Sequence, residues 1–241
     1  MLVRSVRWLA MSLGLATPAL AENCRIALLL ALDVSASVSP ADDLLQRQGL
    51  ALALLSPAVS EAFLAGDPVA LQVFEWAGVS YQRSLLPNWR TIRTEDDLAR
   101  VAKAIEVPLP PALDRSRRRT AVGEALAFAH GTFDQSPDCR ARTLDVSGDG
   151  RSNEGPSASE TYARLPWGSI TVNALVIQGP TREWGISRYF ERFVLRGSGA
   201  FLIEADGYED YRRAMEEKLL REIDEPLASR PTATPRIESS G

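Results

Sequence analysis

The chain has 241 residues, of which 45% are hydrophobic and 24% are charged, as is usual for a globular protein. Its formal net charge at pH 7 is −4, so the sequence offers no overall positive potential that would favour nucleic acid. The single histidine, His130, argues against a histidine-rich zinc site and leaves a Ser-His-Asp triad dependent on one side chain. Its apolar neighbours have helical spacing, which predicts a packed or half-exposed histidine within a helix.

The first 21 residues have the pattern of an export signal. Arg4 and Arg7 precede an apolar stretch from Trp8 to Leu15, and Ala19-Leu20-Ala21 offers the small residues that a signal peptidase needs before Glu22. A transmembrane anchor is the alternative, but the apolar stretch is short for spanning a bilayer, and no later stretch is longer. We therefore expect cleavage before Glu22 and a mature protein without an anchor, in the periplasm or outside the cell.

Strand and helix patterns alternate along the rest of the chain. Strands are predicted at residues 26–32, 69–76, 80–86, 143–146, 170–177 and 200–203, and helices at 39–55, 94–106, 120–133, 157–165, 186–193 and 208–223. The alternation predicts one doubly wound α/β domain over residues 22–224, with helices on both faces of a mostly parallel sheet. Gly78 lies between the predicted strands 69–76 and 80–86, which indicates a hairpin, so one antiparallel edge strand is expected. Residues 225–241, rich in Pro, Ser and Thr, are predicted to be a disordered tail.

The most informative segment is a polar cluster directly after an apolar run. Residues 26–32 are all apolar, which predicts a strand buried on both faces, and Asp33, Ser35 and Ser37 follow it. Open α/β sheets bind ligands at the carboxyl ends of their strands. One carboxylate and two hydroxyls that converge there can bind a hard cation such as Mg²⁺ or Mn²⁺, because these ions prefer oxygen donors.

Two further polar elements are predicted at the same edge of the sheet. Asp145-Val146-Ser147-Gly148-Asp149-Gly150 ends a second apolar strand, and its glycines permit a tight turn that would point Asp149 back over the edge. An ordinary Asp-Gly turn is the alternative. Thr120 begins a predicted helix after a loop, where a plain N-cap is the alternative. The three elements together are more specific than any one of them.

These residues resemble the three loops of the metal-ion-dependent adhesion site (MIDAS) in von Willebrand factor type A domains. The resemblance rests on Asp33-Val34-Ser35-Ala36-Ser37, Thr120 and Ser147-Gly148-Asp149-Gly150, and the order of strands and helices fits over most of the mature chain. Gly148 departs from the family pattern, which usually has threonine or serine directly before the aspartate. The layout also resembles a bacterial group of exported single-domain members of unknown function.

The resemblance implies a metal site and a binding function. Its expected ligands, acting directly or through water, are Asp33, Ser35, Ser37, Thr120 and Asp149, with Asp145 as the alternative in the third loop. The implied ion is Mg²⁺ or Mn²⁺, or else Ca²⁺. Since only two carboxylates are present, the cation would keep much of its charge and an open position. An aspartate or glutamate of another envelope or extracellular protein could fill that position.

Two other classes of function stay open. Asp33 after a buried strand is similar to the nucleophile of aspartate phosphatases, but Ser35 stands where those enzymes carry a second aspartate. A serine hydrolase is disfavoured because the sequence has no Gly-x-Ser-x-Gly motif. A purely structural envelope protein would show no metal-dependent interaction. We therefore expect a non-enzymatic binding module, with a metal-dependent hydrolase or a structural protein as the alternatives.

The two cysteines of an exported chain suggest a disulfide. Cys24 and Cys139 each precede a predicted strand, and if those strands are parallel neighbours both cysteines lie at the same edge of the sheet. Two free thiols are the alternative.

A cluster of arginines lies directly before Thr120 and is predicted to be on the metal face. Arg115, Arg117, Arg118 and Arg119 could attract an acidic partner, whereas a plain solvated loop is the alternative. Trp184 follows another strand and could be an exposed contact residue, although a packed tryptophan is the more frequent case.

Overall fold

The computed structural model describes residues 24–107, 118–179 and 185–228, with side chains up to residue 223. The predicted signal peptide (residues 1–21), Arg115, Arg117, Trp184 and residues 229–241 of the predicted tail lie outside the described residues.

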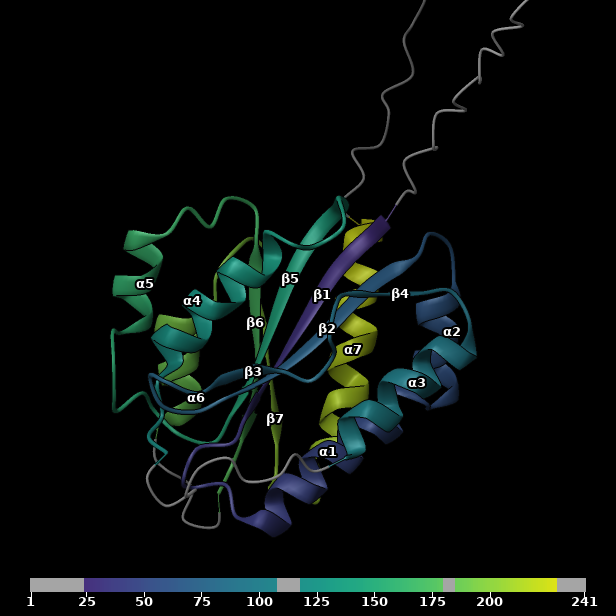
Figure 1. Ribbon diagram of the computed structural model, residues 1–241. Helices are drawn as coiled ribbons and strands as arrows, with labels where there is room; N and C mark the ends of the chain where they lie inside the picture. Colours follow the sequence, from purple (N-terminus) through teal and green to yellow (C-terminus); the bar gives the residue numbers. More distant parts are fainter. Residues whose placement is uncertain (1–23, 108–117, 180–184, 229–241) are drawn as a thin grey trace, which may run out of the picture.

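Within the described residues, seven strands form a single mixed sheet (Figure 1). They are β1 (Cys24–Asp33), β2 (Val69–Trp76), β3 (Gln82–Ser84), β4 (Arg90–Ile92), β5 (Cys139–Gly148), β6 (Thr171–Ile177) and β7 (Leu202–Ala205). The order is β3–β2–β1–β5–β6–β7, and β4 pairs with β2. Strands β2, β1, β5, β6 and β7 run parallel, whereas β3 and β4 pair antiparallel with opposite ends of β2. The predicted fold is confirmed, but its antiparallel edge consists of two short strands.

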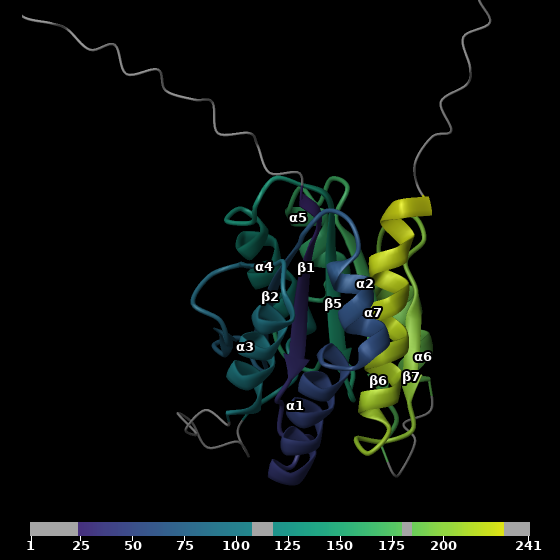
Figure 2. The ribbon, with the colours of Figure 1, turned by 90° about the vertical axis from the view of Figure 1, so that its right-hand side faces the viewer.

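Helices cover both faces of this sheet (Figures 1 and 2). On one face lie α1 (Pro40–Leu54), α2 (Pro57–Leu64), α3 (Glu95–Glu106) and α7 (Tyr211–Ala228). On the other lie α4 (Val122–Phe133), α5 (Ala158–Arg164), α6 (Ile186–Tyr189) and the π-helix η2 (Phe190–Val194). None of the described helices is both long and apolar enough to cross a membrane.

The central strand β1 shows why the sequence needs both layers. All ten of its residues are buried. Ile26 and Leu28 pack in the core beneath α1 and α7, whereas Ala27 and Leu29 pack in the core beneath α4. Because side chains alternate along a strand, an unbroken apolar run can be buried only when both faces are covered.

Several elements differ from the sequence-based predictions. Helix α2 was missed, although Ser56 and Pro57 repeat the N-cap and first-turn proline that correctly located the start of α1. Strand β4 is too short to give a periodic signal. Helix α4 begins at Val122, so Thr120 precedes its N-cap residue Ala121 rather than starting the helix. Helix α7 begins three residues later than predicted and continues beyond residue 225, where the tail was expected to start.

The predicted disulfide is confirmed. Cys24 and Cys139 are paired in register across β1 and β5, with their Cα atoms 4.4 Å apart. The bond therefore joins the amino ends of the two central strands, at the edge opposite the predicted metal loops.

Candidate metal site

Three loops meet at the carboxyl edge of the sheet. The first joins β1 to α1, the second precedes α4, and the third follows β5. Backbone hydrogen bonds link them: Ala36 N donates to Arg118 O at 2.8 Å, and Asn153 N donates to Thr120 O at 2.8 Å. The loops named by the sequence motifs are therefore held together as one unit.

Asp33, Ser35 and Ser37 come together in the first loop. Asp33 ends β1 and is fully buried, and its Oδ1 accepts a hydrogen bond from Ser35 N at 2.7 Å. The hydroxyls of Ser35 and Ser37 are 3.2 Å apart. The other oxygen of Asp33, Oδ2, is buried and has no hydrogen-bond partner among the described residues. A buried carboxylate oxygen without a partner is costly, so it marks a place where a cation would be stabilising.

Asp149 brings the third loop to the same cluster. Its Oδ1 accepts a hydrogen bond from the Ser37 hydroxyl at 2.7 Å, and its Oδ2 accepts one from the Tyr208 hydroxyl at 3.0 Å. Tyr208 comes from the loop between β7 and α7 and is itself buried. No sequence pattern indicates a role for Tyr208, because it lies 59 residues from Asp149 in the chain and outside every motif.

The alternative ligand, Asp145, lies in a different place. Leu144 and Val146 of β5 face the core beneath α4, so the pleat turns Asp145 and Ser147 to the other face of the sheet. There Asp145 is paired with Lys218 of α7, whose Nζ is 3.1 Å from Oδ1. The geometry thus groups Asp149, rather than Asp145, with the hydroxyls of the first loop.

Thr120 occupies the second loop, where it is only 6% exposed. Its backbone N donates to Oδ1 of Asn153 at 2.9 Å, and its carbonyl oxygen accepts from Asn153 N. Asn153, four residues after Asp149, therefore fixes the second loop against the third. This contribution was not recognised from the sequence.

Burial disfavours the ionised form of both carboxyl groups of the site. Burial, followed by the nearby charge of Asp149, raises the pKa of Asp33 to about 8. Burial also raises the pKa of Asp149, despite the hydrogen bonds from Ser37 and Tyr208 that lower it. The pKa of the Tyr208 hydroxyl is raised by burial and by both carboxylates, so it remains a hydrogen-bond donor. A positive charge among these groups would stabilise the ionised carboxylates.

The donor set fits a hard divalent cation. The described residues hold no group of three or more His, Cys, Asp or Glu side chains that could bind a metal. A cation at this edge would therefore take hydroxyl oxygens together with the two carboxylates. All of these donors are oxygens, which suits Mg²⁺, Mn²⁺ or Ca²⁺ better than a metal that prefers sulfur or imidazole.

Gly148, the departure from the family pattern, has a steric explanation. A Cβ atom at this position would lie 3.1 Å from Cζ of Phe190 and 3.4 Å from Oδ2 of Asp33. The ring of Phe190, from η2, thus fills the space that a larger residue would use. Glycine lets the π-helix pack directly behind the site.

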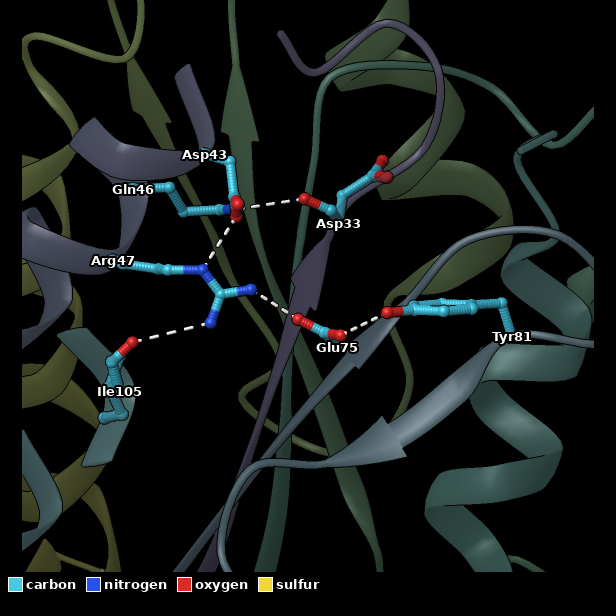
Figure 3. A network of polar contacts seen from close by, with 7 residues as sticks. All are labelled: Asp33, Asp43, Gln46, Arg47, Glu75, Tyr81 and Ile105. Atoms are coloured by element: carbon cyan, nitrogen blue, oxygen red, sulfur yellow. Dashed lines mark hydrogen bonds and ion pairs between the residues drawn. The ribbon is translucent and has the colours of Figure 1, made fainter. Parts of the chain in front are cut away.

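A buried hydrogen bond anchors the first loop to α1. Gln46 donates from Nε2 to the backbone carbonyl oxygen of Asp33 at 2.9 Å (Figure 3). Gln46 is fully buried and shares a helix face with Leu50 and Leu54. A polar residue on an otherwise apolar helix face was the sequence signal for this contact, and it was overlooked.

A buried ionic network extends from α1 to Tyr81 (Figure 3). Nε of Arg47 lies 2.9 Å from Oδ1 of Asp43, and the same guanidinium also pairs with Glu75 of β2. The Tyr81 hydroxyl donates to the other oxygen of Glu75. The guanidinium of Arg118 stacks 4.0 Å from the centre of the Tyr81 ring.

These contacts correct the prediction for Arg118. Its side chain is 6% exposed and packs on Tyr81, so it supports the loops rather than facing a partner. Arg119 is exposed, as expected of a residue that could contact a partner.

A basic groove of about 610 Å³ lies beside the third loop. It is lined by Arg151, Gly185, Arg188, Tyr189, Glu191, Arg192 and Phe193.

Several solved structures share this architecture. The PilB minor pilin from Streptococcus sanguinis matches 87% of this chain and 64% of its own, with 11% identity and a TM-score of 0.61. A von Willebrand factor type A protein from Catenulispora acidiphila matches 83% and 43%, with 15% identity and a TM-score of 0.55. Proximal thread matrix protein 1 from the mussel byssus, described with a zinc-occupied MIDAS motif, matches 83% and 48%, with 14% identity and a TM-score of 0.53. The chain thus spans less than two thirds of each of these proteins.

The fold is that of a von Willebrand factor type A domain. More narrowly, the chain belongs to the family described as Protein of unknown function (DUF1194), whose model matches residues 23–227. A search of curated proteins gave no match.

Proposed function

We propose that this protein is a metal-dependent binding module that captures another protein in the envelope or outside the cell. The proposed ligands of its divalent cation, direct or through water, are Asp33, Ser35, Ser37, Thr120 and Asp149. One observation carries the proposal: within the part of the chain that the structure describes, Oδ2 of Asp33 is buried without a hydrogen-bond partner, next to a second carboxyl group and two serine hydroxyls. These side chains converge although they come from loops more than a hundred residues apart.

The site's own residues suit Mg²⁺ or Mn²⁺, with Ca²⁺ as the alternative. Asp33 is held by Ser35 N, and Asp149 is held by Ser37 and Tyr208, so the oxygens are positioned before any ion arrives. Such preorganisation lowers the entropic cost of binding. When bound, the cation would supply an open coordination position for a carboxylate of the partner.

Positive charges around the site favour an acidic partner. Arg119 is exposed beside the second loop, and Arg151, Arg188 and Arg192 line the basic groove beside the third. The same groove exposes Phe193, which is 40% accessible. Since the whole chain is acidic, this local cluster of arginines would steer acidic segments toward the metal edge.

The disulfide supports export. Disulfides form and persist in oxidising compartments, and the Cys24–Cys139 bond joins the two central strands. Together with the signal pattern of residues 1–21, it supports a location in the periplasm or outside the cell.

The metal is tested by thermal unfolding with Mg²⁺, Mn²⁺, Ca²⁺ or chelator. A cation that binds only the folded state raises stability by RT ln(1 + [L]/Kd), or about 2.7 kcal/mol at a hundredfold excess over Kd. The resulting shift in melting temperature should vanish in Asp33→Ala and Asp149→Asn. It should persist in Asp138→Asn, which changes an exposed carboxylate near the opposite edge. A shift that survives both site variants would refute the metal assignment.

The partner is tested by affinity capture from an envelope extract, with Mg²⁺ or with chelator. Proteins retained by the wild type with metal should be lost with chelator and in Thr120→Ala. Arg188→Glu together with Arg192→Glu should weaken capture, whereas Arg140→Glu, at the amino end of β5, should not. Capture unaffected by chelator would favour a structural envelope protein. Metal-dependent turnover of phosphate esters that Asp33→Asn abolishes in folded protein would favour an enzyme.

A further inference from the structure

A cluster of buried polar side chains lies between α7 and the sheet, outside the proposed metal site. Lys218 and Glu222 of α7 and Asp145 of β5 are 0%, 2% and 1% exposed. Lysine is rare in this chain, since only Lys103 and Lys218 occur among its 27 basic residues. Unlike the guanidinium of arginine, the primary amine of a lysine is a nucleophile in its neutral form.

The cluster is arranged around the amine of Lys218. Its Nζ lies 3.1 Å from Oδ1 of Asp145 and 2.7 Å from Oε1 of Glu222. Asn173 of β6 donates from Nδ2 to the same oxygen of Glu222 at 3.1 Å. The centre of the Phe201 ring lies 4.7 Å from Nζ. The amine therefore contacts two carboxyl groups in surroundings closed to solvent.

As a set of ions this cluster is unbalanced, because two carboxylates face one ammonium. Apart from the ion pair with Lys218, neither oxygen of Asp145 has a hydrogen-bond partner among the described residues, nor does Oε2 of Glu222. Burial raises the pKa of Asp145 to about 7, although the charge of Lys218 opposes the shift. An amide bond forms between a neutral amine and a protonated carboxyl group.

We propose that Lys218 and Asp145 are joined by an intramolecular isopeptide bond, with Glu222 carrying the proton. The neutral Nζ attacks Cγ of the protonated Asp145, and a C–N bond forms. Glu222 accepts a proton from Nζ and delivers it to the departing hydroxyl, so the C–O bond breaks and one water leaves. The product is a neutral amide, and no oxidant, reductant or other reactant is required. Because the fold holds Nζ and the carboxyl group close together, the carboxyl group needs no external activation.

The bond would fasten α7 to β5 directly below the third metal loop. Tyr208, just before α7, donates the hydrogen bond that holds Asp149. A covalently fixed α7 would keep Tyr208 in place and so keep Asp149 oriented. The proposal does not depend on the metal site, because the two clusters use different residues.

Mass spectrometry of the purified full-length or processed chain tests the bond. After denaturation and reduction of the disulfide, the wild type should weigh about 18 Da less than its sequence requires, which is the mass of one water. Digestion should release a cross-linked pair of peptides containing Asp145 and Lys218. Lys103, exposed on α3, is an internal control, because acetylation of the denatured protein should label Lys103 and leave Lys218 unlabelled.

The expected dependence on Glu222 adds a second readout. Glu222→Gln should retain the full mass and accept acetyl groups on both lysines, whereas Glu106→Gln on the surface of α3 should behave as the wild type. If Glu222→Gln does not fold, the mass of the wild-type protein still shows whether the bond has formed. A full wild-type mass with both lysines acetylated would overturn the proposal. A loss of about 17 Da, the mass of ammonia, would place the bond on Asn173 and overturn the assignment to Asp145.

Discussion

Removing the disulfide should cost a large part of the protein's stability. The Cys24–Cys139 bond closes a loop with a sequence separation of 115 residues. In the chain-entropy model, a cross-link of this span removes about 16 cal/mol/K of entropy from the unfolded chain, or about 4.8 kcal/mol at 25 °C. A typical domain has a free energy of unfolding of only about 5–15 kcal/mol, so the contribution of this one bond is comparable to the stability of a whole domain.

Urea unfolding of the wild type and of the double variant Cys24→Ala, Cys139→Ala measures this loss. Reduced wild-type protein is the matched control, because it keeps both sulfur atoms while lacking the bond. The reduced protein should lose about 3–5 kcal/mol, and the double variant somewhat more because Cys24 is buried. A loss below about 1 kcal/mol in reduced wild type would refute the reasoning, since the unfolded chain would then gain little freedom.

Four further outcomes are expected. Arg47→Met leaves two buried carboxylates without their cation, and urea unfolding should show a loss of about 3–5 kcal/mol; an unchanged midpoint would contradict this. Gly123→Ala would put a Cβ atom 2.1 Å from the carbonyl oxygen of Pro156 and should cost about 1–3 kcal/mol. On the same helix, the Cβ atom of Gly131→Ala would meet none of the described residues within 4 Å, so this change should be neutral or stabilising. Because the pKa of Asp33 is raised from 3.8 to about 8, protons compete with the cation, so the Kd for Mg²⁺ should rise about tenfold per pH unit below pH 8. Calorimetric titration from pH 6 to 9 measures it, and a flat profile would contradict it. The same shift implies that stability without metal falls as the pH rises from about 4 to 8, because the folded state binds this proton more tightly than the unfolded chain.

Much of the fold could be predicted because strong local patterns decided it. The apolar run of β1 requires cover on both faces, and the alternation of strands and helices then leads to a doubly wound sheet. Helix α2 escaped prediction because only two residues separate it from α1. The three-residue strand β4 is defined by its pairing with β2, which no local pattern records.

The sequence by itself determined the first loop of the candidate metal site and the position of the disulfide. Asp33, Ser35 and Ser37 lie close in the chain and directly after a buried strand, so their convergence needs little from the rest of the fold. The disulfide followed from the adjacency of two parallel strands whose cysteines hold equivalent positions.

Only the tertiary structure decided the roles of residues whose neighbours are distant in sequence. Asp145 lies within β5 and Asp149 directly follows that strand. The pleat and the packing of α7 place Asp145 beside Lys218, whereas the turn brings Asp149 to Ser37. The sequence alone predicts that Arg118 is an exposed charge, whereas in the structure its guanidinium stacks on the ring of Tyr81. A local pattern records periodicity and turn chemistry, whereas the side of the sheet that a polar residue faces, and the charge it meets there, depend on which helix packs against it.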